Sequence, residues 1–264
     1  MTNPVPLPSA LDQGQGDTAV FLLHGVGGGK RVWAGNMQAL CTAGYRVVAW
    51  DMPGYGDSAS VEPYTTEALA RALERLLDQV GARCNVLLGH SMGGMVAQEA
   101  VALFPHKVQG LVLSGTSASF GPAVGAWQQQ FLQGRFAPLD AGQDMAGLAS
   151  QLVPGMTAPH ASAQSRAAAA AVMAGVPQSS YRAALGAIVS FNRQGNLERI
   201  RVPTLCLAGE HDRNATPAVL RKLSQRIALA QYECLPDVGH LANMEHPEAF
   251  NDAVLEFLHH HFPV

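Results

Sequence analysis

The chain has 264 residues, a net charge of −3 at pH 7, 48% apolar residues and only 14% charged residues. This length suits one large α/β domain or a core with an insertion, and the apolar composition argues against disorder. The small net charge gives no electrostatic reason to expect a nucleic acid or a membrane surface as partner. Composition leaves the oligomeric state open, and a homodimer stays an alternative.

The N-terminal residues and the cysteines favour a reducing, cytoplasmic setting. Residues 1–15 lack a basic segment followed by an apolar one, so we expect no secretory signal, and no run of about 18 apolar residues predicts a spanning helix. The cysteines are scattered and form no C-x-x-C motif: Cys41, Cys84, Cys206 and Cys234. We therefore expect free thiols, without a disulfide framework or a metal site.

The first predicted strand is the apolar run T-A-V-F-L-L at residues 18–23, which has the composition of a strand buried on both faces. It leads into H-G-V-G-G-G-K at residues 24–30. A phosphate-binding loop is one interpretation, but Gly25 lies one residue too close to the Gly-Lys pair and Arg31 follows the lysine. We favour the H-G-x-G oxyanion loop of serine hydrolases, with His24 bracing the loop rather than acting as a base.

Next come a predicted helix at residues 33–43, a strand at 45–50 and a helix at 65–80. The strand ends in the tight loop D-M-P-G-Y-G-D-S at residues 51–58. Asp51 could serve as a catalytic acid, but a carboxylate that accepts hydrogen bonds from loop N–H groups is the better interpretation.

The most informative stretch is C-N-V-L-L-G-H-S-M-G-G-M at residues 84–95. A β-prone run stops at Gly89, and a helix-like segment opens near Gly93. G-x-S-x-G between a strand and a helix is the context of a nucleophile elbow, where a strained turn exposes the serine oxygen. Ser91 is therefore the predicted nucleophile. The alternative is a chance glycine pattern, since the motif alone should occur by accident in roughly one chain in ten of this length.

After a predicted strand at residues 108–114 the pattern changes. Alanine- and glutamine-rich segments, broken by glycine and proline, predict short helices at 126–132, 141–152, 161–174 and 179–189. A helical insertion between two strands of an open α/β sheet would cover the strand ends, where ligands bind. We therefore divide the chain into a first core part, a helical cap and a second core part, at residues 1–116, 117–196 and 197–264.

Strands resume at residues 202–208 and 231–235, and a last helix is predicted at 247–260. Strands that alternate with helices predict a mostly parallel, doubly wound sheet with right-handed crossovers. Loops with ionisable residues follow both strands, G-E-H-D-R-N and P-D-V-G-H-L. In the first of them we expect Glu210 and His211 to face away from any site.

A serine nucleophile needs a base, and that base must be oriented by a third group. Of the ten histidines, only His240 lies in a loop directly after the last strand, while Asp212 lies just past the strand before it. We predict Ser91, Asp212 and His240 as the catalytic residues, in the chain order expected of this elbow. A helix-capping role before Pro217 is the alternative for Asp212, and we expect His90 to point away from Ser91.

The motifs together resemble the α/β-hydrolase superfamily: H-G-V-G, D-M-P-G-Y-G-D-S, G-H-S-M-G-G, A-G-E-H-D and G-H-L-A-N-M-E-H-P-E-A-F. The set is most similar to capped, cofactor-free esterases, enol-lactone hydrolases and carbon–carbon bond hydrolases, and the last motif resembles the 3-oxoadipate enol-lactonase type. The resemblance implies the α/β-hydrolase fold and cleavage of a small ester or lactone by water through an acyl-enzyme on Ser91. It also implies an oxyanion hole made by the N–H groups of Val26 and Met92, and no cofactor.

The chain departs from this pattern in two places. Leu241 follows the predicted base where carbon–carbon hydrolases commonly carry Trp, and the short N-terminus suggests that leading antiparallel strands of the family are shortened or missing. In the cap, Trp127 and Phe131 share a helix face. They either pack the cap or line a substrate pocket together with Leu241. Four cap arginines could form a carboxylate clamp, although solvated surface arginines are commoner: Arg135, Arg166, Arg182 and Arg193.

The same set of residues is also compatible with other functions. They are a carbon–carbon bond hydrolase, a perhydrolase or acyltransferase, and a ligand receptor built on a slow hydrolase. The catalytic residues would look the same in each, so the sequence does not name the substrate.

Overall fold

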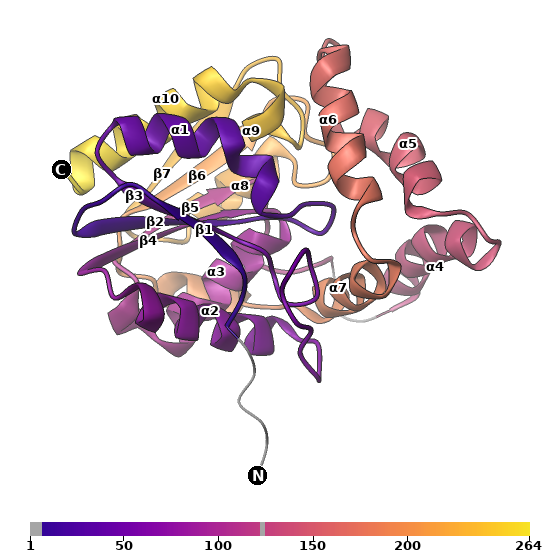
Figure 1. The fold of residues 1–264 in the computed structure, drawn as a ribbon, viewed down its shortest axis with the longest axis horizontal. Helices are drawn as coiled ribbons and strands as arrows, with labels where there is room; N and C mark the ends of the chain where they lie inside the picture. The colour runs from indigo at the N-terminus through magenta and orange to yellow at the C-terminus, as the bar shows by residue number, and fades with distance from the viewer. Residues whose placement is uncertain (1–6, 122–124) are drawn as a thin grey trace.

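The computed structural model describes residues 7–121 and 125–264, and its centre is a seven-stranded sheet with helices on both faces (Figure 1). The strand order is β1-β3-β2-β4-β5-β6-β7, parallel throughout except for β1. The strands are β1 (Ala10–Gln13), β2 (Thr18–Leu23), β3 (Arg46–Trp50), β4 (Cys84–His90), β5 (Gly110–Ser114), β6 (Thr204–Gly209) and β7 (Ala230–Leu235). The predicted, mostly parallel sheet is confirmed.

β1 is a strand that the sequence analysis missed, because residues before 18 lack an apolar pattern. It pairs antiparallel with β3, with Ala10 opposite Trp50 and Gln13 opposite Val47. Three of its four side chains are exposed, so hydrophobic alternation could not reveal it. A short, polar edge strand of this kind also protects the sheet from pairing with another chain.

Two apolar layers enclose the sheet. The helices α2 (Thr66–Val80), α3 (Met92–Leu103) and α8 (Pro217–Ser224) pack in one layer, and α1 (Ala34–Thr42) and α10 (Pro247–His261) in the other. The remaining short helices are η1 (Lys30–Trp33), η2 (Pro105–Lys107), η3 (Gln194–Arg199) and α9 (Ala242–Glu245). Every residue of β2 and β5 is buried, as expected of parallel strands covered on both faces.

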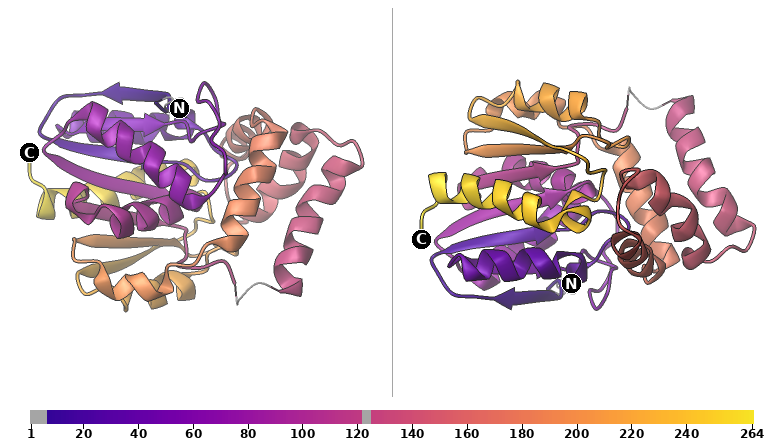
Figure 2. Two further views of the ribbon diagram at one scale, coloured as in Figure 1. Left: turned by 90° about the horizontal axis from the view of Figure 1, so that it is seen from below. Right: turned by 90° about the horizontal axis from the view of Figure 1, so that it is seen from above.

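Four further helices lie between β5 and β6 in the sequence and pack beyond one end of the sheet (Figures 1 and 2). They are α4 (Ala126–Asp140), α5 (Met145–Met156), α6 (Ala163–Ala174) and α7 (Gln178–Ser190), and together they are called the cap below. All four overlap the predicted helices, but α4 continues to Asp140, with Pro138 in its last turn. α5 begins later than predicted because the Asp144 side chain accepts the Gly147 N–H at 2.8 Å and caps it there.

The two chain crossings between core and cap are hydrogen-bonded to each other. Phe120 donates its N–H to the Phe191 carbonyl at 3.2 Å, and Arg193 donates its N–H to the Ala118 carbonyl at 2.8 Å. The Arg193 guanidinium also forms an ion pair with Glu99 on α3. The entry and exit of the cap thus form one short antiparallel pairing that is tied to the core.

No helix in residues 7–121 and 125–264 is long and apolar enough to cross a membrane.

Candidate active site

Ser91 lies on a sharp turn between β4 and α3. Its φ angle is 54°, and Asp237 is the only other non-glycine residue in the described ranges with a positive φ. Such a conformation costs about 1–3 kcal/mol and persists only where the surroundings impose it. Here the Ser91 N–H donates to the Ser114 carbonyl at 2.9 Å, and the Thr116 hydroxyl donates to the Ser91 carbonyl at 2.7 Å. β5 and the residues just after it therefore hold the turn.

Glycines let the strand and the helix approach each other around this turn. A Cβ atom on Gly89 would lie 2.4 Å from the carbonyl oxygen of Gly93, and one on Gly93 would lie 2.0 Å from that of Leu23. Both contacts are with backbone, which cannot move aside without disturbing the sheet. The G-x-S-x-G pattern is thus explained by close packing, as the elbow motif requires.

His240 and Asp212 form a buried pair beside the carboxyl ends of β6 and β7. The Nδ1 atom of His240 is 2.8 Å from Oδ2 of Asp212, and both side chains are almost completely buried. The other carboxylate oxygen accepts the N–H groups of Asn214 at 2.7 Å and Ala215 at 3.0 Å. Asp212 therefore orients the imidazole and caps its own loop at the same time.

The charge of Asp212 fixes the proton on His240. Burial alone would raise the pKa of the Asp212 carboxyl, but the neighbouring His240 and the two loop N–H donors hold it below its ordinary value. An ionised carboxylate can only accept, so the Nδ1–H of His240 donates to it. In the neutral form of the ring, the Nε2 atom then carries no proton and can accept one.

Ser91 and His240 line one cavity under the cap, which has two lobes that meet at these residues. The narrow lobe has a volume of about 80 Å³, and the wide lobe about 340 Å³. Both lobes are lined by Val26, Gly27, Ser91, Met156, Met173 and His240. Apart from Ser91 and His240 these residues are apolar, so a ligand that reaches Ser91 leaves water behind.

The three predicted pocket residues fall in different lobes. Trp127 and Phe131 line the wide lobe with ring centroids 6.2 Å apart, whereas Leu241 lines the narrow lobe. Sequence reasoning missed several further residues of the wide lobe, among them Tyr181 on α7 and Arg213. The position of Arg213 next to Asp212 was a usable signal, but nothing in the sequence distinguishes Tyr181.

The two predicted oxyanion donors belong to different segments, the loop after β2 and the start of α3. Val26 is in the loop after β2 and lines both lobes, and its carbonyl oxygen accepts the Tyr55 hydroxyl at 3.0 Å. Met92 is the first residue of α3, where helical N–H groups have no partner within the helix. Within the described ranges no hydrogen bond occupies the N–H of either residue.

His24 and Asp51 have the structural roles that the sequence predicted. The Met52 N–H donates to Nε2 of His24 at 2.9 Å, so the proton lies on Nδ1, which donates to the Gly25 carbonyl at 2.8 Å. Burial lowers the pKa of His24 to about 4 and keeps the ring neutral. Asp51 accepts the Lys30 N–H at 2.9 Å and pairs with the Lys30 ammonium at 2.9 Å. Neither residue is available as a catalytic base or acid.

The expected orientation of His90 is wrong. Its ring lines the narrow lobe with Ser91 and packs on the His240 ring, with centroids 4.7 Å apart. Gly115 makes room for this arrangement, because a Cβ atom there would lie 3.2 Å from Nδ1 of His240 and 3.3 Å from Cε1 of His90. Burial, followed by the neighbouring His240, lowers the pKa of His90 to about 3. His90 is therefore a neutral packing partner of His240.

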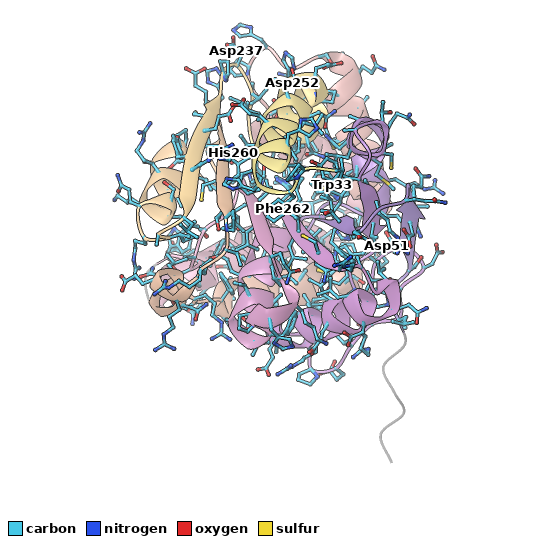
Figure 3. The ribbon with its side chains drawn as sticks, turned by 90° about the vertical axis from the view of Figure 1, so that its left-hand side faces the viewer. Trp33, Asp51, Asp237, Asp252, His260 and Phe262 are labelled. Carbon is cyan, nitrogen blue, oxygen red and sulfur yellow. The ribbon has the colours of Figure 1, made fainter. Side chains whose placement is uncertain are left out.

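The other ionisable candidates lie outside the cavity. Glu210 accepts the Asp237 N–H at 3.0 Å, and His211 lies 3.8 Å from an Asp237 oxygen, so both face away from Ser91 as predicted. These three residues are close enough to share a cation, but they lie at the surface. His260 on α10 is exposed at the end of the molecule opposite the cap (Figure 3).

A comparison with known families now decides the class of this fold. The model of the family described as alpha/beta hydrolase fold matches residues 18–247. The chain belongs to the alpha/beta hydrolase fold family. This finding confirms the resemblance and the fold class inferred from the sequence motifs.

The relatives of this chain include a hydrolase of similar length and a much longer protein. The chain is 31% identical over 282 residues to a 2-hydroxy-6-oxononadienedioate/2-hydroxy-6-oxononatrienedioate hydrolase from Escherichia coli K12, with 94% of this chain and 89% of that protein covered. It spans only 12% of the length of another relative, a polyketide synthase from Burkholderia thailandensis.

Two solved structures share the whole architecture of this hydrolase. An esterase from Thermogutta terrifontis superposes with a TM-score of 0.85 at 26% identity, covering 96% of this chain and 93% of that chain. The enol-lactonase from Burkholderia xenovorans superposes with a TM-score of 0.84 at 26% identity, covering 95% of each chain.

Proposed function

We propose that the protein is a serine hydrolase that cleaves a small carboxylic ester or lactone through an acyl-enzyme on Ser91. The observation that carries the proposal is the arrangement of the cavity. A serine at a strained elbow lines it together with His240, and buried, ionised Asp212 orients that imidazole. The alcohol, the base and the orienting carboxylate come from three separate loops at the carboxyl ends of parallel strands.

The reaction proceeds in two halves. Nε2 of His240 takes the hydroxyl proton of Ser91 while Oγ attacks the carbonyl carbon, and the N–H groups of Val26 and Met92 stabilise the resulting oxyanion. The intermediate collapses to the acyl-enzyme, and the leaving alcohol or enol takes the proton from His240. Water then gives a proton to His240 and attacks the acyl carbon, after which Ser91 is released with its proton restored.

The solved structures support an ester or lactone substrate, since an esterase and an enol-lactonase share this fold over nearly the whole chain. The Escherichia coli relative supports carbon–carbon bond cleavage as a second candidate. Leu241 weighs against that candidate, because carbon–carbon hydrolases commonly carry Trp after the catalytic histidine. The four cysteines are free thiols, which fits the cytoplasmic location expected from the sequence.

Replacement of the nucleophile tests the proposal. Wild-type protein should turn over members of a panel of p-nitrophenyl esters and lactones many times, and Ser91→Ala should lower kcat by at least about 10⁴-fold. The matched control is Ser150→Ala, since Ser150 is exposed on α5 and should not affect turnover.

Both variants should unfold cooperatively near the wild-type temperature. Retained ester turnover in Ser91→Ala would refute the proposal. Wild-type protein that gives a single burst without further turnover would point instead to a ligand receptor. Turnover of vinylogous diketones without turnover of esters would favour the carbon–carbon hydrolase.

A further inference from the structure

The cap arginines differ in how they are bound, and Arg135 stands apart. Arg166 donates to the Ala158 carbonyl at 2.8 Å, Arg182 pairs with Asp140, and Arg193 pairs with Glu99. Within residues 7–121 and 125–264, no carboxylate lies within 4.0 Å of Arg135. Only Arg135 among these four arginines lines the wide lobe that contains Ser91.

The guanidinium of Arg135 is held in place without being neutralised. Its Cζ atom lies 5.2 Å from the centre of the Phe131 ring, one turn earlier on α4. Stacking on an aromatic face leaves the N–H donors at the edge of the guanidinium plane free. Those donors match the two oxygens of a carboxylate, which an arginine binds through paired hydrogen bonds.

The lining of the wide lobe contains two more hydrogen-bond donors, Tyr181 and Arg213. Tyr181 is only 3% exposed and lines the lobe, yet its hydroxyl has no hydrogen-bond partner in the part of the chain that the structure describes. Burial raises the pKa of Tyr181 and Arg135 opposes this shift, so the hydroxyl stays protonated and close to the cation. Arg213 adds a second guanidinium to the lining, and it likewise forms no ion pair in the described ranges.

The described lining of the wide lobe contains no aspartate or glutamate. Its walls are mostly apolar, including Phe120, Trp127, Phe131, Leu185 and Ile188. A cation that faces an apolar cavity loses part of its hydration and gains most from an anion that enters with the ligand. The charge and the walls therefore favour a ligand that is apolar over most of its surface and carries one anionic group.

We propose that Arg135, assisted by Tyr181 and Arg213, binds a carboxylate of the substrate in the wide lobe. The preferred substrates are then esters or lactones with an apolar or aromatic body and one carboxylate away from the scissile bond. This inference rests on the proposed function, because it places the carboxylate relative to a reacting centre at Ser91.

Matched substrates that differ only in charge test the inference. One pair carries the charge on the leaving group, 4-acetoxybenzoate against 4-acetoxybenzamide. The second pair carries the charge on the acyl group and compares monophenyl adipate with the same ester whose free carboxylate is replaced by a carboxamide. In wild-type protein, kcat/KM for the carboxylate should exceed that for the carboxamide about 10- to 100-fold in at least one pair, mainly through KM.

Variants assign the preference to Arg135. Arg135→Gln should bring the carboxylate-to-carboxamide ratio close to one, while Arg135→Lys, which keeps the charge but not the paired donors, should retain part of it. Arg182→Gln is the matched control, since this cap arginine lies outside the wide lobe, and it should leave the ratio as in wild type. A wild-type ratio near one in both pairs, or an unchanged ratio in Arg135→Gln, would overturn the inference while Ser91-dependent turnover still upheld the proposed function.

A binding measurement keeps the test independent of turnover. In the Ser91→Ala variant, calorimetry should show tighter binding of 4-hydroxybenzoate than of 4-hydroxybenzamide, or of adipate monoamide than of adipamide. The added change Arg135→Gln should remove that difference. Equal affinities for acid and amide in both pairs would contradict the carboxylate site even if no hydrolysed substrate is found.

Discussion

The two oxygens of Asp212 have different partners, and this limits what can replace it. Oδ1 accepts two loop N–H groups, from Asn214 and Ala215, while Oδ2 faces Nδ1 of His240. An asparagine would keep its amide oxygen toward the loop donors, because two N–H groups would otherwise meet an NH₂ group. The NH₂ group would then face His240 and act as a donor to Nδ1.

We therefore expect Asp212→Asn to trap the unproductive tautomer of His240, with its proton on Nε2 and unable to take the proton of Ser91. The expected result is a loss of about 10³- to 10⁴-fold in kcat with little change in KM or thermal stability. Steady-state kinetics of an ester substrate check this, with the exposed Asp237→Asn as control. A loss below about tenfold would show that Asp212 does not orient the base.

The sequence analysis could assemble Ser91, Asp212 and His240 because each follows the carboxyl end of a parallel strand, and those ends share one edge. In the wide lobe it named Trp127, Phe131 and Arg135 as candidates but could not place the other lining residues, since their positions depend on how the cap helices pack. Tyr181 lies in an alanine-rich helix, and nothing in the sequence around it distinguishes a pocket-lining aromatic residue from one that packs the cap. His90 was placed wrongly because its position in the elbow does not reveal the space that Gly115 leaves beside the strand end.

At the scale of elements, two helical glycines differ in how much space they leave for a side chain. Gly93 opens α3 against the backbone of β2. For Gly186 in α7, no described heavy atom beyond its chain neighbours and its own helix backbone lies within 4 Å of the position of an added Cβ. The first glycine is required by the close approach of two elements. The second only costs helix stability, because glycine loses more backbone entropy than alanine when it becomes helical.

Gly93→Ala should lower the free energy of unfolding by at least about 3 kcal/mol or prevent folding, because the new methyl group would overlap the Leu23 carbonyl. Gly186→Ala should raise it by about 0.5–1 kcal/mol. Urea denaturation followed by circular dichroism measures both. Similar effects of the two substitutions would contradict the packing described for the elbow.

Element boundaries were predictable only where local chemistry marks them. The leucine pattern of α2 predicted that helix closely, and Thr65 and Gly81 cap its ends as those residue types commonly do. β1 had no such signal, because an exposed edge strand needs neither alternation nor apolar residues. The late start of α5 depends on Asp144, one of several polar residues that could have served as a cap.

For the whole molecule, two buried neutral histidines make folding sensitive to acid. His24 and His90 have pKa values lowered to about 4 and about 3, whereas an unfolded histidine titrates near 6.5. Between pH 6.5 and about 4 the unfolded chain therefore binds protons that the folded protein does not. The free energy of unfolding falls as pH decreases through this window, and above pH 6.5 the two histidines contribute no slope.

Between its unfolded and its folded pKa, we expect each histidine to lower the free energy of unfolding by about 1.4 kcal/mol per pH unit. His24 alone then lowers this free energy by roughly 3 kcal/mol at pH 4. Asp212 does not disturb this range, because its lowered pKa keeps its stabilising charge until the pH falls below its ordinary value. Urea midpoints measured at pH 7.5, 6.0 and 5.0 test the slope. His260→Asn, at an exposed site, should show the same slope, and constant stability from pH 6.5 to 5 would contradict the prediction.

The paired crossing at Phe120 and Phe191 brings the two ends of the cap together at one point of the sheet. β5 and β6 are neighbours, with Ser114 opposite Leu207, so the chain leaves and re-enters the core at almost the same point. The cap is also tied to the loop of His240, because the His240 N–H donates to the Met156 carbonyl at 2.7 Å and the Ala158 N–H donates to the Glu245 carboxylate at 2.7 Å. A transplanted cap would therefore have to supply an acceptor in the place of the Met156 carbonyl, or the loop that carries His240 would lose one of its supports.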